Sequence, residues 1–424
     1  MNNSEFSILV VDDVPDNREV LVRTLKRQGY QTEEAENGQI ALDKLIVGNF
    51  DLMLLDIMMP VMNGFEVLER VKQDPILRHV PVIVISAAAS GDDLESVVKC
   101  IEMGAEDYLP KPFNRTLLKA RVSASLERKR LHDQEQKFAQ QAKRELDFGR
   151  QIQGTFLPST LPDFPNWQID AKFTPAHEVA GDFYDAFALP NNLLGFVMAD
   201  VVDKGVGAAL FMALARSVLR VLAMQAGTRL QTMGGSNSEA YLVRVPGRKA
   251  SDPVTLLPAF TYEILNAVQL TNDYITDNQN DNLQFATLFF GVLDTKTGLV
   301  YYTNAGHDQP VHIGPNGVKG RLPLTGTPVG AMPGVKYRVG TIQMEPGDML
   351  FTYSDGVTEA RASDGSLFGE KRMLDLLARS FQNGTTTPSA IIECISADVA
   401  SHVLDAEPSD DITMLALTWC KPTD

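Results

Sequence analysis

Short continuous apolar runs alternate with amphipathic segments along the first 120 residues. The apolar runs cover residues 6–13 (FSILVVDD), 50–60 (FDLMLLDIMMP) and 80–89 (VPVIVISAAA), and residues 107–113 (DYLPKPF) form a shorter run that ends at a proline. Between them, residues 17–30, 65–73 and 94–104 place apolar side chains at helical spacing. Continuous apolar strands separated by such helices are typical of a parallel sheet covered on both faces. The pattern therefore predicts an α/β domain whose ligand site lies at the carboxyl ends of its strands.

The pattern changes at residues 114–154, which contain no proline and are rich in Lys, Arg, Glu and Gln. This composition strongly favours a helix. A seam of apolar side chains runs along it, with a poor stretch between Glu127 and Lys137. The seam consists of Leu118, Val122, Leu126, Phe138, Ala142, Leu146 and Ile152. We expect a long connecting helix, either a short parallel coiled coil across a homodimer or a solvated single-helix spacer.

The last 260 residues mix β-type runs with helical segments. Strands are expected within residues 195–202, 285–294, 299–306, 348–356 and 412–419, and helices within 204–225 and 368–382. Residues 226–256 are rich in Gly and Ser without a clear period, which predicts a mobile surface insertion. The expected domains are 1–125 (α/β), 126–155 (helical linker) and 156–424 (α+β).

Composition narrows the possible partners. The 424 residues carry a formal charge of −16, which disfavours nucleic-acid binding because phosphate backbones require clustered Lys and Arg. Three scattered cysteines form no CxxC pair and favour a reducing compartment. The N-terminus lacks a secretory signal pattern, and the apolar runs are about half the ~20 residues that span a bilayer. We expect a cytoplasmic protein without a membrane span.

Polar side chains follow the predicted strands of the first domain. Asp12 and Asp13 close the first strand, Asp56 closes a later one, Ser86 ends IVIS and Lys111 follows DYLP. Carboxylates gathered at one sheet edge suit Mg²⁺, and a carboxylate beside Mg²⁺ can attack a phosphoryl group to form an aspartyl phosphate. A lone Asp at a strand end is usually a turn or cap, but this ordered set is far more specific.

Residues 6–125 resemble the receiver domain of two-component response regulators in ILVVDD, DLMLLDIMMPVMNG, VIVISA and DYLPKPF. The resemblance implies a flavodoxin-like doubly wound fold and a cognate sensor histidine kinase. By position, Asp56 is the phosphoacceptor, and Asp12 and Asp13 hold Mg²⁺ with it. Ser86 and Tyr108 stand at the switch positions, and Lys111 is the phosphate-binding lysine.

A second set of acids lies at turns beside the β-runs of the last domain. The set comprises Asp182 and Asp185 in AGDFYD, Asp200 and Asp203 in MADVVDKG, Asp355 in YSDG, and Asp410 and Asp411 in SDDIT. All-carboxylate sites suit hard cations such as Mg²⁺ or Mn²⁺, and two such ions activate water and clamp phosphate oxygens. His307 in NAGH stands alone, and we interpret it as a structural residue. Any single Asp-Gly turn could be an ordinary hairpin.

Residues 145–420 resemble the PPM family of metal-dependent Ser/Thr phosphatases (protein phosphatase 2C-like), in the branch of SpoIIE and RsbU. EVAGDFYD, ADVVDKGVGAAL, FATLFFGVLD, NAGHDQP, YSDGVTEA and SDDITML occur in family order. The resemblance implies a β-sandwich flanked by helices with two Mn²⁺ or Mg²⁺ ions. The implied catalytic metal ligands are Asp182, Gly181, Asp200, Asp355 and Asp410, with Asp411 in place of Asp410 if the register differs by one.

One departure from the family pattern stands beside this second site. The family commonly reads D-x-S-G-K-G where this chain has Asp200-Val-Val-Asp203-Lys-Gly. The phosphate-binding Arg of eukaryotic relatives has no assigned counterpart, and neither does the general acid.

Three functions are compatible with these motifs to different degrees. The first is an enzyme in which phosphorylation of Asp56 regulates a protein Ser/Thr phosphatase, acting within a partner-switching pathway on a phosphorylated STAS-type anti-sigma-factor antagonist. The second is a phosphoprotein-binding adaptor, which the complete acid set disfavours. The third is a DNA-binding response regulator, which the charge and the absence of a helix-turn-helix pattern disfavour. We expect a homodimer through the receiver and the linker helix, with entry helix 146–156 and helix 207–222 as switch elements.

Overall fold

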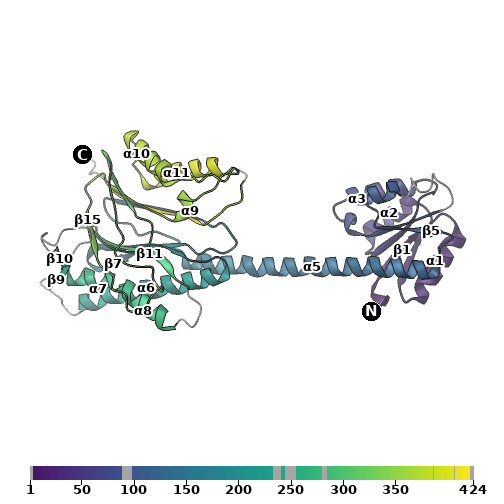
Figure 1. Ribbon diagram of the computed structural model, residues 1–424, viewed down its shortest axis with the longest axis horizontal. Helices are drawn as coiled ribbons and strands as arrows, with labels where there is room; N and C mark the ends of the chain where they lie inside the picture. The colour runs from purple at the N-terminus through teal and green to yellow at the C-terminus, as the bar shows by residue number, and fades with distance from the viewer. Residues whose placement is uncertain are drawn as a thin grey trace. The chain divides into compact units, whose positions relative to one another are not determined.

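The computed structural model describes residues 3–87, 98–232, 240–243, 255–278, 284–384, 386–404 and 406–420. It divides into two compact units, Met1–Ala142 and Lys143–Asp424. A single long helix, α5 (Arg115–Phe156), contributes to both (Figure 1).

The first unit is a five-stranded parallel sheet in the order β2-β1-β3-β4-β5. Its strands are β1 (Ser7–Val11), β2 (Gln31–Ala35), β3 (Leu52–Asp56), β4 (Val82–Ala87) and β5 (Asp107–Lys111). Its helices include α1 (Pro15–Arg27), α2 (Gly38–Val47) and α3 (Gly64–Gln73). This strand order is the flavodoxin-like order, so the predicted fold class is confirmed.

Alternation along the strands explains why both faces of this sheet are covered. Ile8 and Val10 pack with the apolar side of α1 and the start of α5, whereas Leu9 and Val11 pack with α2 and α3. Every second residue thus enters a different core, which is why the strands read as unbroken apolar runs. The predicted helix 94–104 is helical over residues 98–102, and residues 94–97 lie outside the described residues.

The second unit contains two five-stranded antiparallel sheets, in the orders β15-β12-β11-β8-β7 and β14-β13-β16-β17-β6. The first consists of β7 (Phe183–Leu189), β8 (Leu193–Val201), β11 (Ala286–Asp294), β12 (Leu299–Ala305) and β15 (Gly340–Gln343). The second consists of β6 (Trp167–Thr174), β13 (Val311–Gly314), β14 (Gly317–Arg321), β16 (Met349–Tyr353) and β17 (Ile412–Trp419). The predicted α+β sandwich is confirmed.

Helices cover the outer face of each sheet (Figure 1). The first sheet carries α6 (Val206–Thr232), α7 (Ala259–Leu265) and α8 (Ala267–Asn278). The second carries α9 (Asp355–Thr358), α10 (Glu370–Gln382) and α11 (Pro388–Val403). Between the sheets, aromatic and long aliphatic side chains such as Phe196, Phe289 and Leu415 form an apolar core. The four layers therefore bring loops from both sheets together at the ends of the strands.

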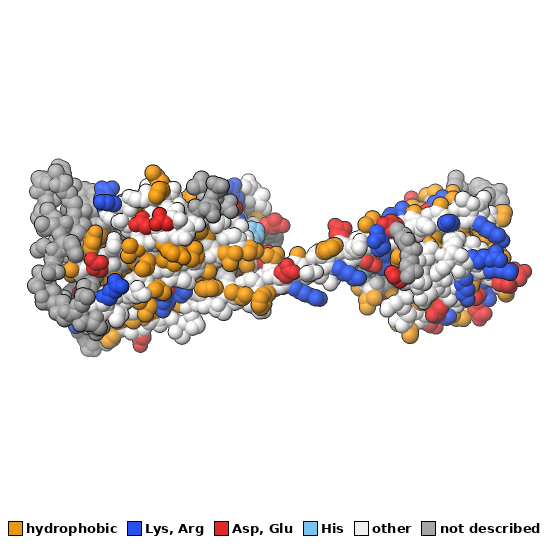
Figure 2. Space-filling view, turned by 90° about the horizontal axis from the view of Figure 1, so that it is seen from below, with side chains coloured by type: hydrophobic (Ala, Val, Ile, Leu, Met, Phe, Trp, Pro, Cys, Tyr) orange, Lys and Arg blue, Asp and Glu red, His pale blue; other side chains and the backbone are white. Residues whose placement is uncertain are grey.

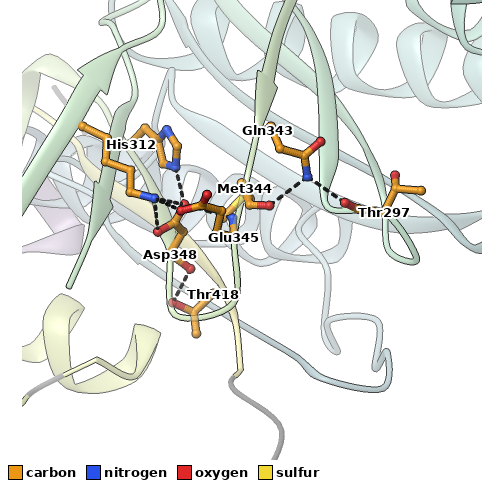
Figure 3. A network of polar contacts seen from close by, with 8 residues as sticks. Thr297, His312, Gln343, Met344, Glu345, Asp348 and Thr418 are labelled. Atoms are coloured by element: carbon orange, nitrogen blue, oxygen red, sulfur yellow. Dashed lines mark hydrogen bonds and ion pairs between the residues drawn. The ribbon is translucent and has the colours of Figure 1, made fainter. Parts of the chain in front are cut away.

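The end of the sandwich at the β15–β16 turn is closed by a polar network. Buried Asp348 accepts hydrogen bonds from the backbone of Glu345 and contacts His312 Nε2 at 2.8 Å (Figure 3). Its backbone carbonyl accepts a hydrogen bond from Thr418 at 3.2 Å. Since Asp348 precedes β16 and Asp355 follows it, this network lies at the opposite end of that strand from the acid set.

The predicted insertion at 226–256 is partly wrong. Helix α6 continues to Thr232, and β9 (Ala240–Val243) pairs antiparallel with β10 (Thr255–Pro258). Ala226 still packs against the core of the first sheet, and Gly227 lies against Pro190 and Leu189, so the helix continues past the predicted end. Residues 233–239 and 244–254, on which the predicted mobility also falls, lie outside the described residues.

Helix α6 stands out by its hydropathy. Among the described residues, Val206–Arg229 is the one stretch long and apolar enough to cross a membrane by length and composition. Its Phe211, Met212 and Leu219 pack in the core of the first sheet, and its Arg216 and Arg220 pair with buried Asp185. One side of α6 therefore packs on the first sheet, while 33% of its most apolar window is buried overall.

Candidate active site

The acids of the first unit converge at the carboxyl ends of β1 and β3. Ligand oxygens of Asp12, Asp13 and Asp56 all lie within 4.8 Å of one another. Lys111 Nζ, at the end of β5, lies 2.8 Å from Asp12 Oδ2 and 2.9 Å from Asp56 Oδ2. The sheet topology alone explains this convergence, because parallel strands end at one edge.

Burial sets the electrostatics of this edge. Burial raises the pKa of Asp56, and the hydrogen bond and charge of Lys111 oppose that rise. Burial by itself lowers the pKa of Lys111, but its hydrogen bonds to Asp12 and Asp56 outweigh it and raise the pKa overall. An all-oxygen donor set of three carboxylates fits Mg²⁺, and the lysine stays charged beside the incoming phosphoryl position.

The two predicted switch residues lie on neighbouring strands of the same edge. Ser86, on β4, is buried and lies in register with Pro110 beside Lys111. Tyr108, on β5, is half-buried, and the Arg121 guanidinium lies 5.2 Å from its ring centroid. The structure thus places Ser86 near the acids and Tyr108 toward the surface of β5 and α5.

In the second unit, the four predicted acids come from both sheets. Asp182 precedes β7 and Asp200 lies near the end of β8, both in the first sheet. Asp355 begins α9 after β16, and Asp410 precedes β17, both in the second sheet. The sandwich therefore joins residues that are more than 200 positions apart in sequence.

Mutual repulsion and burial dominate this acid set. Burial, then the charge of Asp200, raises the pKa of Asp182 well above its usual range. Burial, then the charge of Asp355, raises the pKa of Asp200 to about 7. Burial, then the charge of Asp410, raises the pKa of Asp355. Crowded carboxylates of this kind fit hard divalent cations, which would offset the repulsion.

The acids of the second unit are spaced differently from those of the first unit. Within the described part of the chain, they do not bring three ligand atoms within 4.8 Å of one another as Asp12, Asp13 and Asp56 do. Ligands shared between two ions that lie roughly 3.5–4 Å apart extend over a wider site than the ligands of a single ion.

The contacts of Asp410 and Asp411 distinguish the roles of these two neighbouring residues. Asp411 accepts hydrogen bonds from the backbone of Ala176 and Gly181, each at 2.8 Å, so both of its carboxylate oxygens hold the loop before β7. Asp410 Oδ2 instead forms an ion pair with Lys204 at 3.0 Å. Asp410 is therefore the better candidate ligand, and Asp411 a residue that positions Gly181 and Asp182.

Two glycines allow close approach of these loops. A Cβ on Gly181 would lie 3.1 Å from the Val201 carbonyl oxygen, and one on Gly356 would lie 2.0 Å from the Asp411 carbonyl oxygen. The second distance leaves no room for any side chain, so the Asp355-Gly356 turn packs directly on the Asp411 backbone.

Three other residues of the predicted motifs have contacts that do not involve a metal site. Asp185 is fully buried and paired with Arg216 and Arg220 of α6, at 2.8 Å each, so it fixes the helix to β7. Asp203 is exposed at φ 88°, the left-handed region that glycine favours at this family position. His307 is buried against Thr287, and burial lowers its pKa to about 4, as expected of a neutral structural histidine.

A glutamine of α5 reaches the same loop. Gln153 Nε2 donates to the Ala180 carbonyl at 2.6 Å, and the Ala180 amide donates to Gln153 Oε1 at 3.0 Å. The Gln153 side chain is buried near the end of the long helix, and its partner Ala180 directly precedes Gly181 and Asp182. The sequence alone does not identify Gln153, because a buried Gln beside the apolar positions of a helix carries no periodic signal.

A polar cleft of about 570 Å³ opens over Asp200 and Asp355. Its lining adds residues that the sequence did not single out, including Asp308, Arg321, Glu359 and Glu370. Burial, then the charge of Asp355, raises the pKa of Asp308 to about 6. Asp308 and Glu359 lie inside the NAGHDQP and YSDGVTEA motifs. This position is the sequence signal that could have identified them as cleft residues.

Comparison with known proteins agrees with this architecture. The response regulator receiver domain family matches residues 8–123, and the Stage II sporulation protein E (SpoIIE) family matches residues 190–420. Protein IcfG of Synechocystis is 42% identical over 273 residues, covering 64% of this chain and 41% of IcfG. Transcriptional regulatory protein CpxR of Escherichia coli is 40% identical over 129 residues, covering 30% of this chain and 53% of CpxR.

Solved structures include the SiaA-PP2C domain of Pseudomonas aeruginosa, at 19% identity and a TM-score of 0.49, covering 66% of this chain and 98% of that one. The PP2C domain of SpoIIE from Bacillus subtilis has 15% identity and a TM-score of 0.45, covering 61% of this chain and 64% of that one. The two family models show a SpoIIE-type domain, related to PPM phosphatases, that follows a receiver domain. The chain belongs to the SpoIIE family.

Proposed function

We propose that the chain is a two-component response regulator in which phosphorylation of Asp56 regulates a metal-dependent protein Ser/Thr phosphatase. The observation that carries this proposal is the placing of Asp182, Asp200 and Asp355 by both sheets at the same end of the sandwich, where burial and neighbouring carboxylates raise the pKa of each. Such a set is destabilising unless cations bind to it. Mn²⁺ or Mg²⁺, when bound there, would supply an activated water and neutralise phosphoryl charge.

The residues of the chain have separate roles in this scheme. Asp182, Asp200, Asp355 and Asp410 would hold the two ions, with the Gly181 backbone close by. Asp411 and Thr413 orient this set, since the Thr413 hydroxyl donates to Asp182 Oδ2 at 2.6 Å. In the receiver, Asp12, Asp13 and Asp56 would hold Mg²⁺, with Lys111, Ser86 and Tyr108 responding to the phosphoryl group.

The proposed substrate is a phosphorylated STAS-type anti-sigma-factor antagonist, supplied by a partner-switching pathway, and the proposed phosphodonor is a sensor histidine kinase. The support for the substrate is the family to which the chain belongs. The chain spans only 41% of the length of IcfG, so its activity as a whole is inferred from its own two domains.

Helix α5 is the proposed transmitter. It begins beside β5 of the receiver and ends with Gln153 bound to the loop that carries Asp182. A homodimer is proposed through the receiver and α5, where Phe138 and Phe148 are exposed at 72% and 64%. A change in pairing of α5 would then move the Ala180 loop.

The test is phosphate release from candidate phospho-STAS proteins with Mn²⁺, with and without beryllofluoride to occupy Asp56. We expect metal-dependent turnover that is lost in Asp200→Asn and Asp355→Asn. Tight binding of the phosphoprotein with metal present and no phosphate release would instead favour the adaptor function.

A further inference from the structure

The cleft over the acid set has one wall built by residues outside the proposed metal site. Arg321 ends β14 and Glu370 begins α10, and the two side chains form an ion pair there. The described lining contains five carboxylic acids, Asp200, Asp308, Asp355, Glu359 and Glu370. Arg321 is the one Lys or Arg among the described lining residues.

Arg321 is held in a fixed orientation. Its Nε donates to the Gln309 carbonyl at 2.8 Å, its Nη2 donates to the Tyr353 hydroxyl at 2.7 Å, and its Nη1 donates to Glu370. The Tyr353 hydroxyl also donates to Glu370 at 3.2 Å. These contacts use three of the five N–H donors of a guanidinium, while the side chain stays 23% exposed. A planar cation is therefore oriented at the cleft before any ligand arrives.

Charge explains why this arrangement matters for a phosphoprotein. A phosphoserine brings a dianion toward a cleft that is itself lined by carboxylates, and an acidic neighbouring residue would add to the repulsion. A guanidinium matches the oxygen pairs of carboxylate and phosphate groups in a bidentate geometry, which a lysine cannot do. Glu370 is half-exposed, so an incoming oxyanion can replace it at modest cost.

We propose that Arg321 is a specificity-determining residue that binds an oxyanion of the phosphoprotein at the wall of the cleft, in exchange for Glu370. This rests on the proposed phosphatase function and adds a substrate contact to it. This oxyanion is either the phosphoryl group itself or the carboxylate of a residue next to the phosphoserine. The simpler alternative is that the Arg321–Glu370 pair only fixes α10 to β14.

The experiment compares Arg321→Ala, Arg321→Lys and Glu370→Gln with Lys371→Ala, which removes an exposed cation next to Glu370. Each full-length protein is assayed with Mn²⁺ on p-nitrophenyl phosphate, on a phosphoserine peptide flanked by Asp, and on the same peptide flanked by Ala. Anisotropy of the labelled peptides gives Kd without turnover, and thermal melting reports on folding.

We expect Arg321→Ala to raise KM and Kd for the Asp-flanked peptide about tenfold, with kcat changed less than twofold. Arg321→Lys should recover only part of the loss, and Glu370→Gln should shift KM in the opposite direction because Arg321 loses its competing partner. A loss confined to the Asp-flanked peptide identifies the carboxylate source, and an equal loss on all three substrates identifies the phosphoryl group.

If the Arg321–Glu370 pair only stabilises the fold, the variants should behave differently. Arg321→Ala and Glu370→Gln would then both lower the melting temperature and shift KM in the same direction, and that result overturns the proposal. Unchanged Kd in Arg321→Ala overturns it as well. If the wild-type protein turned over none of the three substrates, the proposed function would fail, while the Kd values would still decide the role of Arg321.

Discussion

At the scale of single residues, the raised pKa of Asp200 has a consequence for stability. Its pKa is about 7 in the folded chain and about 3.9 for an unfolded Asp, so the folded state binds more protons between these values. Stability of the metal-free protein should therefore fall as pH rises from about 4 to about 7. We expect the melting temperature in EDTA to drop over this window, to drop less in Asp200→Asn, and to recover with Mn²⁺. A flat profile in the wild type would contradict the crowding of these acids.

Substitution of Asp203 would measure how much a left-handed backbone conformation lowers the free energy of unfolding. At φ 88° an L-residue with a Cβ is strained by roughly 1–2 kcal/mol, and Asp tolerates this region better than most residues. Asp203→Gly should raise the free energy of unfolding by about 1 kcal/mol, measured by urea denaturation. Asp203→Asn is the control and should change it little. Destabilisation by the glycine would mean that the hydrogen bond from the Lys204 amide to Asp203 Oδ1 outweighs the strain.

Among elements, the link between α5 and the Ala180 loop is the most direct route to the acid set. Gln153→Ala leaves a buried backbone amide and carbonyl of Ala180 without partners, at a cost of roughly 1–3 kcal/mol. We expect the Mn²⁺ concentration for half-maximal activity to rise several-fold. Gln151→Ala, at an exposed position on the same helix, is the matched control. Equal metal dependence in the two variants would remove Gln153 from the regulatory scheme.

Elements also differ in how far the sequence predicts them. Strands such as β3 and β11 can be predicted from the sequence because most of their residues are apolar. Helix α11 also has signals in the sequence, namely a Pro in its first turn and Ile391, Ile395 and Val399 at helical spacing, which are buried in the structure. The pairing of Asp185 with Arg216 cannot be predicted in this way, because it depends on how α6 packs on β7. No local sequence pattern encodes that packing. The same holds for the wall formed by Arg321 and Glu370.

For the whole molecule, an apolar surface of the phosphatase unit bears on assembly. Figure 2 shows hydrophobic side chains gathered on the face where Figure 1 places α6 and α8. The exposed apolar residues of α6 include Leu210, at 68%, with Leu214, Val221 and Met224, and α8 exposes Leu270. Contiguous apolar surface of this kind favours contact with another chain. Leu210→Arg should therefore weaken self-association in sedimentation velocity, whereas Met332→Arg, at an exposed loop position, should not. Identical sedimentation of all three proteins would exclude this surface from the dimer.

Continuity of α5 makes a final prediction about signalling between the two units. The helix runs unbroken from Arg115 to Phe156, and Gln140 is exposed near its middle. Gln140→Pro removes a backbone donor and clashes with the preceding turn, which costs about 3 kcal/mol of helix stability locally. Both sites lie outside this stretch, so basal Mn²⁺-dependent turnover should persist, while the change in turnover that beryllofluoride causes in the wild type should disappear. Gln140→Ala preserves the helix and should retain the response. If the proline variant responded to beryllofluoride as the wild type does, the signal would have to pass by direct contact between the units and not along α5.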